Sequence, residues 1–346
     1  MSILQRPLAI TLGDAAGIGP EIIVQAFRDA PQLLAGCFVA GDPAVLRRAA
    51  AWVRRAGEAD IPVAVLDSPT EALAAPPRCV PVLPVAALAA PVVPGQLSAE
   101  AGRLAGHCVS WAAQAALRGE IAGLVTAPLH KEALSAAGAP YDAFPGHTEL
   151  LQAEAAAFLG KPVAEVPVRM MLANEELRTV LVSIHVSLRQ AIEAVTRDNV
   201  LETLHITHAA LARMLGRAPR MAVAGLNPHA GEGGLFGREE IEVIAPAMAQ
   251  AQAEGLDVHG PYPPDTVFMR ARQGEFDVVV AMYHDQGLIP VKYLGVEKGV
   301  NVTLGLPLVR TSPDHGTAFD IAGRGQADAS SLIEAVRMAR RLGHAA

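Results

Sequence analysis

Residues 7–30, PLAITLGDAAGIGPEIIVQAFRDA, place a buried strand, a glycine-rich turn and a helix in immediate succession. Residues 7–12 are apolar apart from one threonine, which is typical of a strand covered on both faces. Residues 20–30 begin with a proline, which favours the first turn of a helix. This stretch predicts an α/β protein, because the chain beyond it repeats the same alternation of strand and helix.

The alternation continues almost to the end of the chain. Apolar runs predict strands at residues 37–40, 121–126, 168–172, 179–184, 221–226 and 277–282. Helices are expected at residues 44–55, 98–118, 188–196, 198–215 and 238–254, with Ser98 as an N-cap. Residues 74–95 are rich in proline and alanine, and we expect them to be irregular because repeated prolines interrupt hydrogen-bond ladders. The pattern predicts a mainly parallel sheet covered by helices on both faces.

The composition excludes several classes of protein. The chain has 346 residues, of which 51% are hydrophobic, so a substantial core in one or two domains is expected. There are 28 basic and 35 acidic residues, a net charge of −7, which argues against a nucleic-acid partner. No apolar run approaches the roughly 20 residues of a membrane span, and the run near the N-terminus is too short for a signal peptide. We therefore expect a cytoplasmic protein that binds no membrane.

The three cysteines agree with a reducing compartment. Cys37, Cys79 and Cys108 are far apart and odd in number, so they form neither a metal-binding pair nor a disulfide framework.

Polar residues follow five of the expected strands. His185 comes after TVLVSI, His229 after MAVAGLNP and His284 after DVVVAMY, while Asp14 and Thr126 end two other strands. In open α/β sheets the ligand crevice lies outside the carboxyl ends of the strands. Three neutral imidazoles suit a divalent transition metal with an open coordination position. Alternatively, each histidine merely caps a strand or satisfies a loop, and the pattern alone does not separate the two interpretations.

Two glycine-rich stretches follow strands and precede helices. Residues 13–19 and 231–237 could let backbone N–H groups approach an anion at a helix N-terminus. Neither matches GxGxxG, and no GK[ST] phosphate-binding sequence occurs. The glycines by themselves therefore do not indicate nucleotide binding.

Seven ordered segments resemble the 4-hydroxythreonine-4-phosphate dehydrogenases, the PdxA family, nearly from end to end of the chain. They are ITLGDAAGIGPEI, LVTAPLHKEAL, PGHTELL, MMLANEELRTVLVSIHVSLR, NPHAGEGGLFGREE, AMYHDQGLIPVK and GVNVTLGLPLVRTSPDHGTAFDIAG. Their order and spacing make the resemblance specific.

The resemblance implies a two-domain α/β/α architecture similar to that of the isocitrate and isopropylmalate dehydrogenases, which also lack the Rossmann fingerprint. It implies a first domain of residues 1–128 and 293–346, a second of residues 129–292, and an active-site cleft between them. It further implies a homodimer with the active site near the subunit interface.

The resemblance also implies a reaction. The family oxidises the 3-hydroxyl of 4-phosphohydroxy-L-threonine with NAD or NADP, and the resulting β-keto acid loses carbon dioxide to give 3-amino-2-oxopropyl phosphate, in pyridoxine and pyridoxal phosphate biosynthesis. The expected partner is thus a small phosphorylated hydroxy acid. The residues that contact the nucleotide cannot be named from the sequence.

Particular residues match the site of the family. His185, His229 and His284 match its ligands for a divalent metal, with zinc, cobalt, magnesium and manganese as candidates. The residues that match its substrate-binding positions are His147, Thr148, Lys292, Asn301 and Arg310. Lys292 and Arg310 provide localised positive charge for a phosphate or carboxylate in an acidic chain. Lys292, Asp265 and a metal-bound water are the alternatives for the general base.

Departures from the family pattern favour alternatives within the same class. Ala15 stands where the family usually has proline, and residues 141–145 form a longer lead into GHTE. Both keep a paralogous NAD-dependent dehydrogenase of a four-carbon sugar-acid phosphate as the nearest alternative to the leading reaction, the oxidation of 4-phosphohydroxy-L-threonine. A branch that oxidises aromatic dicarboxylate cis-dihydrodiols ranks lower, because the GHTE and NVTLGLPLVR sequences are present. Phosphate acyltransferases and a catalytically silent metal-binding protein are alternatives from other classes, and the presence of all three histidines and Lys292 argues against both.

Overall fold

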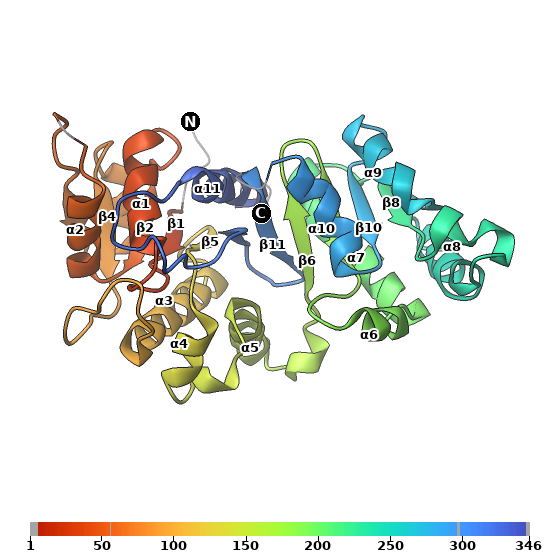
Figure 1. The fold of residues 1–346 in the computed structure, drawn as a ribbon, viewed down its shortest axis with the longest axis horizontal. Coiled ribbons are helices and arrows are strands. Elements are labelled where there is room, and N and C mark those ends of the chain that lie inside the picture. Colours follow the sequence, from red (N-terminus) through yellow and green to blue (C-terminus); the bar gives the residue numbers. More distant parts are fainter. Residues whose placement is uncertain (1–5, 56, 296–297, 344–346) are drawn as a thin grey trace. The chain divides into compact units, whose positions relative to one another are not determined.

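The computed structural model describes residues 6–55, 57–295 and 298–343 (Figure 1). These residues form two compact units. The first unit contains the described residues up to Pro167 and from Leu306 onward, and the second contains Val168–Gly305. Within the described ranges, no helix has the length and apolar character needed to cross a membrane.

The strands of the first unit form a parallel sheet in the order β3-β4-β2-β1-β5-β12. Its strands are β1 (Leu8–Thr11), β2 (Cys37–Gly41), β3 (Val63–Val65), β4 (Val80–Pro84), β5 (Gly123–Thr126) and β12 (Arg310–Pro313). Every residue of β1, β2, β5 and β12 is buried. This burial is what a parallel sheet covered on both faces requires.

Two groups of helices cover this sheet. Helix α1 packs against α2 and α11, whereas α3 packs on β1, β2 and β5 and carries α4 and α5 on its outer side (Figure 1). The helices are α1 (Gly19–Asp29), α2 (Pro43–Trp52), α3 (Ala99–Leu117), α4 (Lys131–Ala136), α5 (His147–Leu159) and α11 (Ser330–Gly343), with short 3-10 turns η1 (Pro69–Ala74), η2 (Tyr141–Ala143) and η3 (Val163–Glu165). The Ser98 hydroxyl accepts a hydrogen bond from Ala101 N at 3.2 Å, so it is the N-cap of α3.

The second unit has a mixed sheet in the order β11-β6-β7-β10-β8-β9. Strands β7, β10, β8 and β9 are parallel to one another, and β6 is antiparallel to both β7 and β11. The strands are β6 (Arg169–Ala173), β7 (Arg178–Leu181), β8 (Met221–Ala224), β9 (Val258–Tyr262), β10 (Val278–Ala281) and β11 (Val300–Leu304). The carboxyl ends of β7, β10 and β8 therefore meet at one edge of the sheet.

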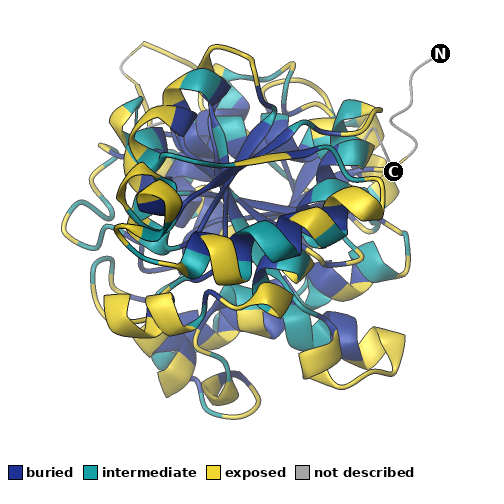
Figure 2. Cartoon of the chain, turned by 90° about the vertical axis from the view of Figure 1, so that its right-hand side faces the viewer, coloured by how far each residue is buried: buried dark blue, intermediate teal, exposed yellow. Residues whose placement is uncertain are grey.

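Helices of the second unit pack on the sheet and enclose an apolar core. The helices are α6 (Leu188–Glu193), α7 (Arg197–Leu215), α8 (Ala245–Ala253), α9 (Pro264–Arg272) and α10 (His284–Tyr293), with the 3-10 segment η4 (Pro228–Gly234) and the π-helix η5 (Glu240–Ile244). Leu181, Phe268 and Leu288 belong to one buried cluster that joins the sheet to α9 and α10. Figure 2 shows this arrangement as dark blue strands beneath helices whose outer faces are yellow.

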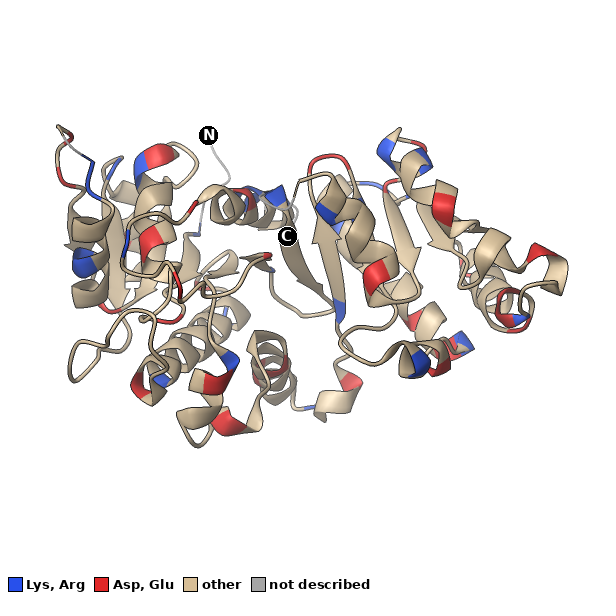
Figure 3. Cartoon of the chain, viewed as in Figure 1, with Lys and Arg blue, Asp and Glu red and all other residues tan. Residues whose placement is uncertain are grey.

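Charges of both signs are mixed on the described surface (Figure 3). Many form short-range ion pairs, such as Arg118 with Glu120 at 2.6 Å and Arg272 with Glu176 at 2.6 Å. Within each such pair the opposite charges compensate each other locally.

The prediction of a mainly parallel α/β protein is confirmed. The prediction that residues 74–95 are irregular throughout is wrong for five of them. Residues 80–84 form β4, which lies between β3 and β2. Proline has no backbone N–H to donate to a neighbouring strand, but only two residues of β4 are prolines, Pro81 and Pro84. The other three, Val80, Val82 and Leu83, are buried apolar residues. Tertiary burial overrode the local proline signal.

The boundaries of the two units differ from the domain boundaries that the family resemblance implies. Residues 129–167 were assigned to the second domain, but α4 and α5 pack on α3 of the first unit. Residues 293–305 were assigned to the first domain, but β11 pairs with β6 of the second unit. Strand pairing and helix packing between distant segments decided both boundaries, and neither leaves a mark in local sequence.

Candidate active site

Three histidines follow neighbouring parallel strands of the second unit. His185 comes four residues after β7, His284 three residues after β10, and His229 five residues after β8. Strand β10 pairs in parallel with both β7 and β8, so the three strands end at the same edge of the sheet. This edge is where the crevice of an open α/β sheet is expected.

His185 and His284 lie together. Their ring centroids are 5.6 Å apart, and both side chains line a pocket of about 460 Å³. The other lining residues are Ser183, Ile184, Val186, Leu188, Ala191, Tyr283 and Asp285. The Ser183 hydroxyl donates to Met282 O at 3.0 Å, which ties the two strand ends together.

Asp285 orients the His284 ring. Its Oδ1 is 2.7 Å from His284 Nδ1. A carboxylate at this distance favours the tautomer with the proton on Nδ1, which leaves the Nε2 lone pair of His284 available. Carboxylate-bound imidazoles of this kind are common among metal ligands.

His229 does not join the other two histidines. It is exposed, lies on a turn of left-handed backbone (φ 53°) and contacts the Phe236 ring, with 6.0 Å between centroids. Among residues 6–55, 57–295 and 298–343 of a single chain, no group of three or more His, Cys, Asp or Glu side chains is arranged to hold a metal ion. Two imidazole donors thus fit a divalent metal in chemistry and spacing, and the three-histidine site stays a prediction.

Arg310 and Thr126 form a buried polar pair in the first unit. Arg310 begins β12 and is only 4% exposed. Its Nε and one terminal nitrogen both donate to Thr126 Oγ1 at the end of β5, at 3.1 and 2.8 Å. Burial lowers the pKa of Arg310 to about 10, so the guanidinium stays charged at neutral pH. The pair places a fixed positive charge at the carboxyl end of β5.

His147 lies in the field of this arginine. It is the first residue of α5, and its Nε2 is buried without a hydrogen-bond partner among the described residues. Burial, and then the positive charge of Arg310, hold the pKa of His147 well below its usual value of 6.5. His147 is therefore neutral at pH 7 and has one ring nitrogen ready for a ligand. Thr148 follows it in the first turn of α5 and is half-buried.

The remaining predicted residues are spread over other elements of the second unit. Lys292 is half-buried in the last turn of α10, and Asn301 is half-buried on β11 opposite Leu172. Asp265 is exposed in the first turn of α9.

Sequence reasoning missed His130, which lies next to the first glycine-rich turn. The His130 ring stacks on Phe319, with centroids 4.7 Å apart and planes 18° apart. Nearby, Asp14 is fully buried and accepts from Ala16 N at 2.8 Å, and burial raises the pKa of its carboxyl. His130 follows the strand at residues 121–126, so the strand-end rule that selected the other histidines could have found it.

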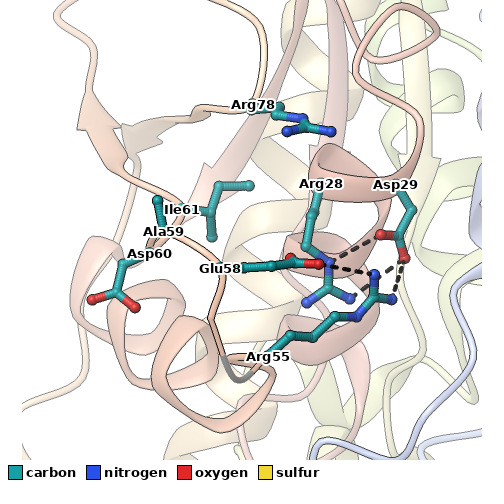
Figure 4. A pocket seen from close by; sticks show the side chains of 8 residues that line it. All are labelled: Arg28, Asp29, Arg55, Glu58, Ala59, Asp60, Ile61 and Arg78. Atoms are coloured by element: carbon teal, nitrogen blue, oxygen red, sulfur yellow. Dashed lines mark hydrogen bonds and ion pairs between the residues drawn. The ribbon is translucent and has the colours of Figure 1, made fainter.

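A second pocket, of about 570 Å³, lies elsewhere in the first unit (Figure 4). Three arginines and three acidic residues line it, so its formal charges balance. Arg28 and Arg55 both bind Asp29, at 2.9 and 3.1 Å. The pocket lies beside the ends of β3 and β4 that are remote from Thr126, and we do not assign it to the active site.

Comparison with known proteins places the chain in a family. Residues 34–339 match the family model described as pyridoxal phosphate biosynthetic protein PdxA. The chain is 52% identical over 343 residues to a 4-hydroxythreonine-4-phosphate dehydrogenase of Beijerinckia indica, covering 99% of this chain and 96% of that one. It is 43% identical over 352 residues to a D-threonate 4-phosphate dehydrogenase of Salmonella typhimurium, covering 97% of this chain and 99% of that one.

A solved structure agrees with these matches. The fold is similar to the crystal structure of 4-hydroxythreonine-4-phosphate dehydrogenase from Klebsiella pneumoniae, with a TM-score of 0.86 and 41% identity over 98% of this chain and all of that one. The chain therefore belongs to the PdxA family of pyridoxal phosphate biosynthetic proteins.

Proposed function

We propose that the protein is an NAD-dependent or NADP-dependent dehydrogenase that oxidises the 3-hydroxyl of 4-phosphohydroxy-L-threonine. Decarboxylation of the product then gives 3-amino-2-oxopropyl phosphate, a step of pyridoxal phosphate biosynthesis. The observation that carries this proposal is the 52% identity, over nearly the whole of both chains, to a relative named for this activity. The placement of polar groups at the carboxyl ends of the strands supports it.

The metal site would be formed by His185, His229 and His284. When bound, a divalent metal such as zinc, cobalt, magnesium or manganese supplies a Lewis acid that stabilises negative charge developing on the substrate. The pair His185 and His284, 5.6 Å apart and lining one pocket, supports this assignment.

The substrate would be bound through its anionic groups. Arg310 offers a fixed guanidinium, and the neutral His147 offers a ring nitrogen without another partner among the described residues. Thr148, Lys292 and Asn301 would add further donors. Charge-assisted hydrogen bonds of this kind are shorter and stronger than neutral ones, so a few local cations can bind a phosphate in a chain of net negative charge.

A second candidate is a dehydrogenase of a four-carbon sugar-acid phosphate. The 43% identity to a D-threonate 4-phosphate dehydrogenase over 97% of this chain favours it. The two substrates share a phosphate and an oxidisable hydroxyl, and they differ in the group at the carbon next to the carboxylate. The distinction therefore depends on a few side chains near that carbon.

Formation of NADH tests the two candidates directly. The enzyme, NAD and a divalent metal are mixed in turn with 4-phosphohydroxy-L-threonine, D-threonate 4-phosphate and the dephosphorylated form of each. Fastest turnover of the first compound supports the leading proposal, and fastest turnover of the second supports the alternative. Turnover that is indifferent to the phosphate would contradict both.

Lys292→Ala distinguishes phosphate binding from acid–base catalysis. One charge-assisted hydrogen bond is worth roughly 1.5–3 kcal/mol, so we expect a ten- to hundredfold loss of kcat/KM on the phosphorylated substrate. If Lys292 binds the phosphate, the variant should turn over the dephosphorylated substrate about as well as the wild type does. If Lys292 acts at the hydroxyl, both substrates lose equally. The exposed Lys298, also changed to alanine, is the control.

We further propose a cytoplasmic homodimer with the active site near the subunit interface. Exposed apolar side chains flank two of the histidines and support such an interface: Val186, Leu188, Ile192, Leu235 and Phe236. Sedimentation should give a dimer at assay concentration, whereas an active monomer contradicts the proposal. Fractionation of the source cells tests the compartment.

A further inference from the structure

The turn that carries His229 has an unusual backbone. His229, Ala230, Gly231, Glu232 and Gly233 all have positive φ, at 53°, 52°, 79°, 43° and 65°. Three of the five are not glycine, and such residues enter the left-handed region only at a steric cost. A run of this kind persists only where the surrounding structure holds it in place.

The carboxylate of Glu240 holds the start of this turn. Glu240 is 3% exposed, and its Oε1 accepts from Asn227 N at 2.7 Å while its Oε2 accepts from Asn227 Nδ2 at 2.9 Å. Glu239 Oε2 also accepts from Asn227 Nδ2, at 2.7 Å. Both carboxylates thus bind the residue that lies two positions before His229. We call Asn227 and Glu240 the Asn227–Glu240 clamp.

The glycines of the turn fit closely around this clamp. A Cβ on Gly231 would lie 2.7 Å from Glu240 Oε2, and a Cβ on Gly237 would collide with the Asn227 side chain. Backbone hydrogen bonds from Ala230 N to Asn227 O (3.1 Å) and from Phe236 N to Gly231 O (3.2 Å) close the loop onto itself. The turn and the clamp therefore form one packed unit.

We propose that Glu240 is a positioning residue that fixes the direction of His229 through Asn227. The inference rests on the proposed function, in which His229 is a metal ligand. Because both carboxylate oxygens of Glu240 bind Asn227, Glu240 acts on the site through the backbone of the turn. Burying a carboxylate costs free energy unless the carboxylate accepts hydrogen bonds, and Asn227 donates two to Glu240. The buried Glu240 carboxylate and the turn at Asn227 therefore stabilise each other.

Glu240→Gln tests the proposal, with Zn²⁺ affinity of the metal-free protein as the readout. The amide puts a donor where Asn227 needs an acceptor, so at least one of the two hydrogen bonds is lost. Residues that orient a metal ligand typically change metal affinity by ten- to a hundredfold, and we expect a loss of that size. At saturating Zn²⁺, kcat should return to within a few-fold of the wild-type value. Wild-type Zn²⁺ affinity in Glu240→Gln overturns the proposal.

Glu242→Gln is the matched control, because Glu242 lies in the same π-helix but is exposed and pairs with Arg238, at 2.5 Å. Its Zn²⁺ affinity should equal that of the wild type, and an equal loss in both variants overturns the proposal.

If Glu240→Gln fails to fold, Asn227→Ala replaces it. Asn227→Ala removes the side-chain amide that donates to Glu240 but retains the hydrogen bond from the backbone N–H. We therefore expect a smaller loss of Zn²⁺ affinity than in Glu240→Gln. An unchanged Zn²⁺ affinity overturns the proposal.

His229→Ala separates this inference from the proposed function. If His229→Ala binds Zn²⁺ as the wild type does, the assignment of His229 as a ligand fails. If His229→Ala loses Zn²⁺ but Glu240→Gln does not, only the positioning role fails.

Discussion

His284→Ala is expected to lose bound metal and to lower kcat/KM by about a thousandfold or more. The His284 ring is oriented by Asp285, lies 5.6 Å from the His185 ring and lines the same pocket. In the proposed three-histidine site, removing one of the protein ligands leaves the metal incompletely bound. A Lewis-acid metal contributes several kcal/mol to transition-state stabilisation, and about 4 kcal/mol corresponds to a thousandfold in rate. Metal content by elemental analysis and steady-state kinetics provide the two measurements.

The control for this prediction is His259→Ala. His259 is an exposed histidine of the same unit, on β9, with its Nε2 2.6 Å from Asp257 Oδ1. Alanine there should change neither metal content nor turnover. Wild-type protein treated with a chelator should match His284→Ala and should recover activity when the metal is restored. Full metal content together with full turnover in His284→Ala would rule out the metal site.

Arg310→Met is expected to lower kcat/KM for the phosphorylated substrate by about a hundredfold to a thousandfold. The guanidinium is buried and fixed by two hydrogen bonds to Thr126. Loss of two charge-assisted hydrogen bonds to an anionic group costs about 3–4 kcal/mol, which gives this range. Methionine removes a buried charge whose desolvation is costly, keeps most of the apolar length of the side chain, and leaves the neutral Thr126 hydroxyl rather than an opposite charge behind. The melting temperature should therefore change little, which separates a binding defect from unfolding.

Thr126 provides a finer test of the same arginine. Thr126→Val has nearly the same shape but no hydroxyl, so two guanidinium N–H groups lose their acceptor. We expect KM to rise about tenfold, as one hydrogen bond to a charged group predicts. Thr126→Ser restores the hydroxyl and should restore KM. A normal KM in Thr126→Val would show that Thr126 does not position Arg310 for the substrate.

The sequence could predict β1, β2, β5, β6, β7, β8 and β10, because the apolar run that forms each of them is a local property, but it did not predict β3, β4, β9, β11 or β12. Apart from Thr11, Thr126 and Asp277, the runs at residues 7–12, 121–126 and 277–282 contain no polar side chain, and burial on both faces of a parallel sheet selects such runs. The strand-end rule then picked out His185, Arg310's partner Thr126 and His284 without any structure. The start of α3 was also predictable, since a serine N-cap is read from the chain itself.

What the sequence could not predict depends on contacts between distant segments. Thr126 and Arg310 are 184 residues apart in the chain, and only the parallel pairing of β5 and β12 places the guanidinium on the hydroxyl. The depressed pKa of His147 arises from burial and from that same arginine, so it too is a tertiary property. Local pattern contains no information on either.

The sequence by itself therefore determined the fold class, the family and which residue types stand at the ends of the strands. Tertiary structure decided that residues 129–167 belong with the first unit, that the proline-rich residues 80–84 form a strand, and that two of the three histidines lie together while His229 lies on a left-handed turn. The physical reason is the separation in sequence of the groups involved: apolar patterning and helix capping depend on neighbours along the chain, whereas burial, strand pairing, helix packing and the Asn227–Glu240 clamp depend on segments that only the fold brings together.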